Sequence, residues 1–179
     1  MTNPFPTIQD LAEKNAGATS AFKPKLTLQG LMSRNAMAII SCMDPRADPK
    51  DFWGIEAGMP PAMIRNAGGR AADALRSLEI LSALGEGLSA VAVVHHTHCG
   101  VGQHGIDDAH IKRTLPGRMK GSPSALGGKT WDSYKHQMEE ESVREDMRLV
   151  LADELLPKDV QVLGFVLDVE TNRTTEVRL

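Results

Sequence analysis

Short apolar segments alternate with amphipathic segments along this chain. Nearly continuous apolar runs predict buried strands at 36–42, 89–95 and 160–169. Residues 71–84 are predicted to form a helix, because their apolar positions recur every three or four residues. Strands that alternate with helices indicate an α/β fold, built on a mostly parallel central β-sheet flanked by helices.

Turn residues and charge assign the segments between these elements. A short strand is expected at 62–65, and another at 174–177 that returns as an antiparallel edge strand. Residues 100–130 contain seven glycines and two prolines, and we expect an irregular, solvent-exposed loop there rather than an anion-binding lid. A helix is predicted at 137–156, and we expect it to be well buried because apolar side chains cover much of it. These side chains are Met147, Leu149, Val150, Leu151, Leu155 and Leu156.

The first 35 residues have a different character. Residues 6–15 predict a short amphipathic helix that begins at Pro6 and places Ile8 and Leu11 on one face. We therefore expect residues 1–35 to form an N-terminal helical arm and residues 36–179 to form a single α/β domain.

The composition is that of a globular protein. The chain has 179 residues, of which 41% are hydrophobic and 24% charged, with a net charge of −3. This charge gives no electrostatic reason to bind nucleic acid or an anionic membrane, and no apolar run approaches the roughly 20 residues of a membrane span. Only two cysteines are present and the N-terminus has no hydrophobic signal core, so we expect a cytoplasmic location.

Both cysteines lie where a predicted strand ends. The motif Cys42-Met-Asp44-Pro-Arg46 closes the first strand, and His96-Thr-His-Cys99 follows the strand at 89–95. Ligands bind beyond the carboxyl ends of the strands in a parallel sheet, so the two motifs are expected to share one site. Thiolate and imidazole groups bind zinc, and a catalytic zinc site uses three protein ligands and leaves the fourth position for water.

Other chemistry fits these motifs less well. A structural zinc site needs a fourth ligand, which would have to be Asp44, His95 or His98. Loops of the tyrosine-phosphatase type have five residues between the nucleophilic cysteine and the arginine, whereas only three lie between Cys42 and Arg46. A redox pair usually has the spacing C-x-x-C. The spacing of Asp44 and Arg46 favours a bidentate ion pair, which either orients the carboxylate for catalysis or only stabilises the loop.

The joint pattern C-x-D-x-R and H-x-x-C resembles that of the β-class carbonic anhydrases, in particular their compact microbial and fungal branch. The resemblance covers about residues 36–169. Three further segments are similar to the family's R-N-A-G turn, the helix after it and its closing strand: 65–68, 73–78 and 164–169.

This resemblance implies a ligand set and a role for the ion pair. One zinc ion would be held by Cys42, His96 and Cys99. Asp44, paired with Arg46, would accept a hydrogen bond from the zinc-bound water. In a closed form of the family, the aspartate binds the metal instead.

Two further groups of residues have candidate roles. Gly68 and Gly69 precede a predicted helix, whose backbone N–H groups would hold an anion such as bicarbonate, although a tight turn also explains these glycines. The product proton needs a carrier that titrates near neutrality, and histidine does so. The candidates are His95, His98, His104 and His110.

The implied reaction is the hydration of carbon dioxide to bicarbonate by a metal-bound hydroxide. The alternative is hydrolysis of carbonyl sulfide to hydrogen sulfide and carbon dioxide at the same zinc. A non-catalytic zinc or bicarbonate sensor, with Asp44 permanently closing the coordination shell, ranks third because Arg46 would pull Asp44 off the metal. The resemblance also implies a homodimer or homotetramer, in which residues 6–15 reach across to another subunit.

Overall fold

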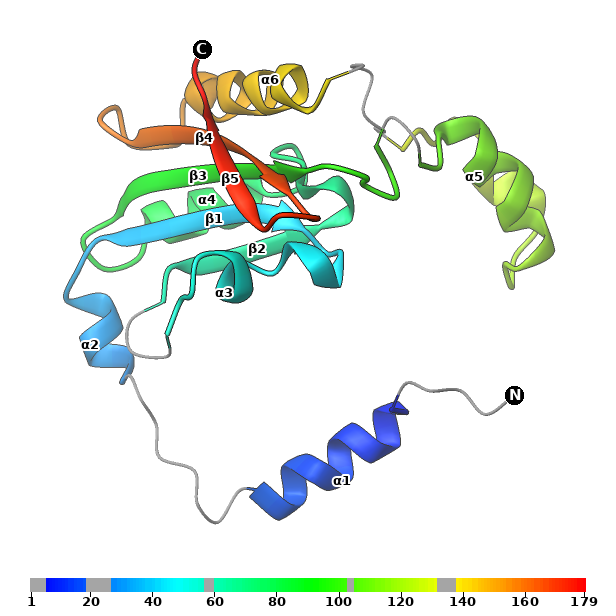
Figure 1. Ribbon diagram of the computed structural model, residues 1–179, viewed down its shortest axis with the longest axis horizontal. Helices are drawn as coiled ribbons and strands as arrows, with labels where there is room; N and C mark the ends of the chain where they lie inside the picture. The colour runs from blue at the N-terminus through cyan, green and yellow to red at the C-terminus, as the bar shows by residue number, and fades with distance from the viewer. Residues whose placement is uncertain (1–5, 19–26, 57–59, 103–104, 132–137) are drawn as a thin grey trace.

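A five-stranded sheet forms the centre of the molecule, with the strand order β2-β1-β3-β4-β5 (Figure 1). The first four strands of this order pair in parallel, and the last pairs antiparallel with its neighbour. The strands are β1 (Ala36–Cys42), β2 (Ala62–Asn66), β3 (Leu88–His96), β4 (Gln161–Asp168) and β5 (Arg173–Val177). The predicted fold class is confirmed, including the antiparallel edge strand. The computed structural model describes residues 6–18, 27–56, 60–102, 105–131 and 138–179.

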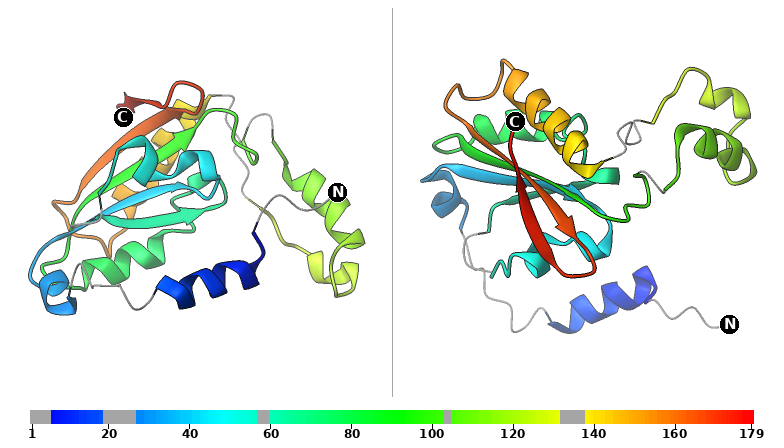
Figure 2. Two further views of the ribbon diagram at one scale, coloured as in Figure 1. Left: turned by 60° about the horizontal axis from the view of Figure 1, so that its bottom comes forward. Right: turned by 45° about the horizontal axis from the view of Figure 1, so that its top comes forward.

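Helices cover both faces of this sheet (Figures 1 and 2). The α-helices are α1 (Ile8–Ala18), α2 (Leu28–Met32), α3 (Pro49–Phe52), α4 (Leu75–Ser82), α5 (Asp108–Thr114) and α6 (Glu139–Ala152). Short 3-10 helices are η2 (Pro45–Ala47), η3 (Ala67–Gly69), η4 (Leu115–Gly117) and η5 (Pro123–Leu126). No helix in the described ranges is both long and apolar enough to span a membrane.

The core is divided between the two faces of the sheet, because successive residues of a strand point to opposite sides. Ile40 and Val93 belong to the larger cluster, which packs against α4 and α6. Ile39 and Val94 belong to the smaller cluster, which includes Phe52 of α3. Both faces of β1 and β3 are therefore buried, which explains why these strands read as continuous apolar runs.

The segment predicted to be an irregular loop is partly helical. Helix α5 and the 3-10 helices η4 and η5 stand away from the sheet in both views of Figure 2. Local interactions stabilise α5: the Asp107 side chain accepts a hydrogen bond from the His110 N–H, and Lys112 pairs with Asp108. The predicted exposure is correct, but the absence of regular structure is wrong.

The prediction that α6 is buried over most of its surface is also wrong. Its buried residues are Ser142, Val143, Asp146, Met147 and Val150, which form one stripe along the sheet. Leu149, Leu151 and Leu155 lie on or beyond the other side and are exposed. A single helix on an open sheet buries only the stripe that faces the strands, so the remaining leucines stay accessible.

Candidate metal centre

Two sulfur atoms and one imidazole converge at the carboxyl ends of β1 and β3. Cys42 ends β1, His96 ends β3, and Cys99 follows three residues later. All three residues are buried, and their ligand atoms lie within 4.8 Å of one another. The two Sγ atoms are 3.9 Å apart. Among the residues that the structure describes, this is the one group of three such side chains close enough to hold a metal ion.

The orientation of the imidazole suits a metal. His96 Nδ1 lies 2.9 Å from the carbonyl oxygen of Thr97, which fixes the ring. Its Nε2 atom is buried and makes no hydrogen bond within the described part of the chain. A buried polar atom of this kind normally has a partner, and a metal ion would supply it. Two thiolates and one imidazole are a donor set that zinc accepts.

The sulfur atoms of the two cysteines are hydrogen-bonded to each other. A hydrogen bond from Cys99 lowers the pKa of Cys42, with help from the backbone N–H groups of Asp44 and Gly68. The same hydrogen bond, together with burial, raises the pKa of Cys99. Burial opposes protonation of His96, but interaction with the Cys42 sulfur outweighs it and raises the pKa of His96. The pair therefore has one sulfur already in the thiolate form that binds metals.

Asp44 and Arg46 form a bidentate pair at the edge of this cluster. Asp44 Oδ1 accepts from Arg46 Nε at 3.1 Å, and Oδ2 accepts from Arg46 Nη2 at 2.7 Å. The hydrogen bonds from Arg46 lower the pKa of Asp44 to about 2. Both carboxylate oxygens thus face the guanidinium, and Asp44 does not belong to the group of three side chains that could hold a metal ion.

Arg65 of β2 supports the same loop, a role that the sequence analysis missed. It donates to the carbonyl oxygen of Cys42 at 3.1 Å and to that of Asp44 at 2.7 Å. Its third contact is with Asp48 Oδ2 at 2.6 Å. Because β2 pairs with β1 in register, with Ser41 opposite Arg65, the guanidinium reaches past the end of β1. The sequence signal for this role was an arginine at the end of β2, the strand that pairs with the strand ending at Cys42.

Gly68 and Gly69 lie in the 3-10 turn η3, and the next helix begins only at Leu75. Their φ angles of 83° and 69° are those that glycine adopts without strain. A Cβ on Gly69 would lie 2.8 Å from the backbone nitrogen of Cys42. The tight turn is thus present, and it precedes α4 as expected, while anion binding by these glycines stays a prediction.

The candidate proton carriers are separated by the fold. His95 is fully buried, and burial lowers its pKa despite a hydrogen bond with Asp146. His98 is exposed, with a left-handed φ of 54°, and its carbonyl oxygen accepts from Arg46. His110 lies on α5, away from the sheet, and His104 falls outside the described residues.

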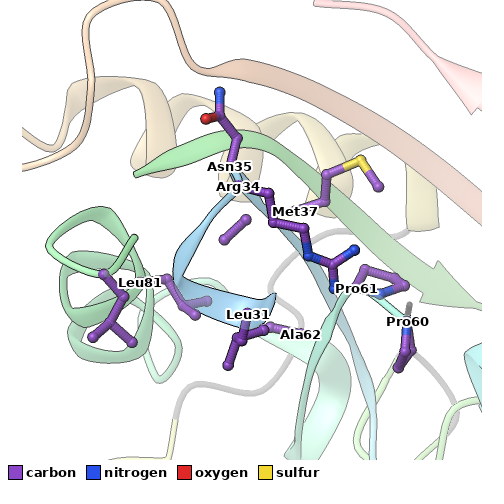
Figure 3. Close-up of a pocket in the computed structure, with 10 residues that line it drawn as sticks. Leu31, Arg34, Asn35, Met37, Pro60, Pro61, Ala62 and Leu81 are labelled. Carbon is purple, nitrogen blue, oxygen red and sulfur yellow. The ribbon is translucent and has the colours of Figure 1, made fainter. Parts of the chain in front are cut away.

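A mainly apolar pocket of about 250 Å³ opens over the cluster. Its lining residues are Cys42, Met43, Asp44, Pro45, Ala67, Gly68, Cys99, Gly100 and Val101. A second hollow, of about 290 Å³, lies at the opposite, amino-terminal ends of the strands (Figure 3). Its lining residues are Leu31, Arg34, Asn35, Ala36, Met37, Pro60, Pro61, Ala62, Leu81 and Leu84. None of these is a histidine, cysteine or carboxylate, so the second hollow offers no metal ligands.

Comparisons with known proteins agree with this geometry. No protein-family model matches the chain. The chain is 31% identical over 169 residues to β-carbonic anhydrase 1 of Mycobacterium tuberculosis, covering 94% of the chain and 96% of that protein. It is 26% identical to a carbon disulfide hydrolase of Acidianus, covering 82% and 79%. The solved carbonic anhydrase of Glaciozyma antarctica superposes with a TM-score of 0.79 at 30% identity, covering 96% and 98%.

The parallel sheet and the buried cysteine–histidine–cysteine cluster at its carboxyl edge define an α/β protein with a candidate metal site, whose donor set zinc accepts. The identity of 31% extends over nearly the whole length of both chains. The chain belongs to the β-carbonic anhydrase family, whose relatives include a carbon disulfide hydrolase.

Proposed function

We propose that the protein hydrates carbon dioxide to bicarbonate, with a zinc ion held by Cys42, His96 and Cys99. The observation that carries this proposal is the convergence of three buried donor atoms beside a carboxylate that is kept off the metal by Arg46. Family membership supports it, because a relative 31% identical to this chain is a β-carbonic anhydrase.

A zinc ion at such a site would lower the pKa of water, so that hydroxide, the attacking group, forms near neutral pH. Two thiolates cancel the formal charge of the ion, so the acidifying effect is weaker than with three neutral histidines. We therefore expect activity that rises towards alkaline pH.

The chain itself supplies orientation and exclusion of water. Asp44 stays ionised at neutral pH, because Arg46 lowers its pKa to about 2, and it therefore accepts a hydrogen bond from the attacking water. That bond orients the water towards a substrate in the pocket. Met43, Pro45 and Val101 give the pocket apolar walls, which suit a small linear molecule without charge.

Hydrolysis of carbonyl sulfide is the second candidate. The relative from Acidianus is a carbon disulfide hydrolase, so this family includes enzymes that attack sulfur analogues of carbon dioxide. The apolar pocket accepts either molecule. A sensor with Asp44 permanently on the metal is disfavoured, because both carboxylate oxygens are bound to Arg46.

The test is an assay of the zinc-loaded protein with carbon dioxide and with carbonyl sulfide over about pH 6.5 to 9, where zinc-bound water titrates. Asp44→Asn removes the charge next to the metal site, and Asp51→Asn is the matched control at an exposed position of the same connection. Fast carbon dioxide hydration that falls in Asp44→Asn alone supports the proposal. Sulfide release with slow carbon dioxide turnover favours the second candidate, and zinc binding without either activity would refute both.

We also propose that residues 1–35 form an arm that packs on a second copy of the chain. Helix α1 lies apart from the sheet in all three ribbon views (Figures 1 and 2), and Ile8 on this helix is 82% exposed. An apolar helix face is stable in water only when it is covered. Light scattering should give the mass of a dimer or tetramer, and Ile8→Asp combined with Leu11→Asp should lower it. A monomeric wild-type protein would contradict this assembly.

A further inference from the structure

A buried polar network lies behind the metal cluster, on the other face of the sheet. Successive strand residues point to opposite faces, so His96 faces the pocket while His95 faces α6. There His95 Nε2 lies 3.0 Å from Asp146 Oδ2. The side chains of His95 and Asp146 are both 0% exposed.

Asp146 connects α6 to the turn between β2 and α4. Its Oδ2 also accepts a hydrogen bond from the Ala71 backbone N–H at 3.1 Å, and its Oδ1 lies 3.1 Å from Arg70 Nη2. A buried carboxylate is costly unless it is paired, and here Oδ2 accepts a hydrogen bond while Oδ1 is ion-paired with Arg70. The carboxylate therefore holds the end of this turn and His95 at fixed positions relative to each other.

The start of the same turn is held to its end. The Asn66 side chain accepts from the Arg70 N–H at 2.7 Å and donates to the Arg70 carbonyl at 2.8 Å. Arg70 in turn reaches Glu145 of α6 at 3.0 Å. Residues 66–71 thus form a closed unit, which side chains of α6 hold from behind the sheet.

This unit touches the metal cluster directly. The Asn66 carbonyl accepts from the Met43 N–H at 2.8 Å, and Gly69 packs against the Cys42 backbone. A shift of the turn would therefore change the position of Cys42.

We propose that Asp146 is a positioning residue for the metal site. Through Ala71 and His95 it holds the 66–71 turn and the end of β3 from behind the sheet, and so sets the donor geometry of Cys42 and His96. This inference rests on the proposed zinc site and deepens it. Partners outside the ligand shell commonly change metal affinity or activity by about 10- to 100-fold when they are mutated.

The test compares Asp146→Asn with Glu145→Gln. The first keeps the size of the side chain but removes the charge that serves Ala71, His95 and Arg70. The second removes a charge from the same helix, at a residue that contacts Arg70. Ala71 and His95, by contrast, are bonded to Asp146. Zinc affinity is measured by competition with a chelator, and the thiolate-to-cobalt absorption band is recorded after cobalt replaces zinc. We expect Asp146→Asn to weaken zinc binding about 10-fold or more and to shift the band. Glu145→Gln should have a clearly smaller effect on both, because Glu145 reaches the turn through the Arg70 side chain.

Four outcomes would overturn the proposal. One is a folded Asp146→Asn protein with wild-type zinc affinity and cobalt spectrum, even if its unfolding temperature falls, since Asp146 then only stabilises the fold. Another is an equal effect of Glu145→Gln. If Asp146→Asn does not unfold cooperatively, His95→Gln is measured in the same way, and a wild-type spectrum there is the third. A wild-type protein that binds neither metal is the fourth outcome, and it shows that the zinc site itself is wrong.

Discussion

Replacing Gly69 by alanine tests how closely the turn packs on β1, the strand that ends at Cys42. An added Cβ would lie 2.8 Å from the backbone nitrogen of Cys42, 2.9 Å from the carbonyl carbon of Ser41 and 3.1 Å from the carbonyl oxygen of Val94. All three contacts are with backbone atoms at the ends of β1 and β3. Backbone atoms cannot rotate away as a side chain does, so either the turn or the strands must move.

Two costs combine at this position. The φ angle of 69° places alanine in the left-handed region, at a cost of about 1 kcal/mol. Overpacking against fixed atoms adds about 1 to 3 kcal/mol. Gly54 has a φ angle of 58° with nothing within 4 Å of its Cβ position, so Gly54→Ala carries the first cost alone. The gain from restricting the unfolded chain is the same in both variants.

The measurement is urea or thermal unfolding of both variants, with zinc and after its removal, at one protein concentration. Gly69→Ala should lose about 1 to 3 kcal/mol more than Gly54→Ala, and each kcal/mol corresponds to about 2 to 4 °C in a chain of this size. Gly69→Ala should also bind zinc more weakly, because the displaced atoms include the backbone of Cys42. Equal losses in the two variants would refute the close packing of the turn.

Three further predictions concern the site. Arg65→Lys keeps the charge, but lysine cannot bind the two carbonyl oxygens and Asp48 at once. We therefore expect kcat to fall about 10-fold or more with little change in KM. An unchanged kcat would contradict a role of Arg65 in fixing the loop. The pKa of Asp44 is lowered from 3.8 to about 2, so its ionised form stabilises the fold above about pH 4, and this contribution is lost as pH falls towards 2. The free energy of unfolding of the wild type should therefore exceed that of Asp44→Asn above about pH 4, and acid unfolding should show this difference shrinking towards pH 2. Removing zinc with a chelator should lower the unfolding temperature of the wild type but not of Cys99→Ser, which differential scanning calorimetry measures.

The strands and the cysteine–histidine cluster follow from the sequence for one physical reason. β1 and β3 are covered on both faces, so their sequences are continuous apolar runs, and the polar residues that end them must lie at the carboxyl edge of the sheet. Cys42 and His96 are these residues. The sequence thus predicts which side chains meet, although it contains no measure of their distance.

The supporting residues were harder to predict. Helix α6 contains five acidic residues within its first eight positions, and composition does not distinguish the one that faces the sheet. The signal was position: Asp146 lies in the same helical stripe as Val143, Met147 and Val150, where an apolar residue is normally found. A charged residue in such a stripe indicates a buried partner, and here the partners are His95 and the 66–71 turn.

The group of Cys42, His96 and Cys99 is therefore supported from two directions by charged side chains that do not belong to it. Arg65 reaches it from β2 and holds the carbonyl oxygens of Cys42 and Asp44. Asp146 acts from α6, on the opposite face, and holds the turn that packs against the Cys42 backbone. Because both supports act on Cys42, and Arg65 adjoins the 66–71 turn in the chain, the effects of Arg65→Lys and Asp146→Asn on the free energy of zinc binding should not add. Additive effects in the double variant would show instead that the loop and the turn respond independently.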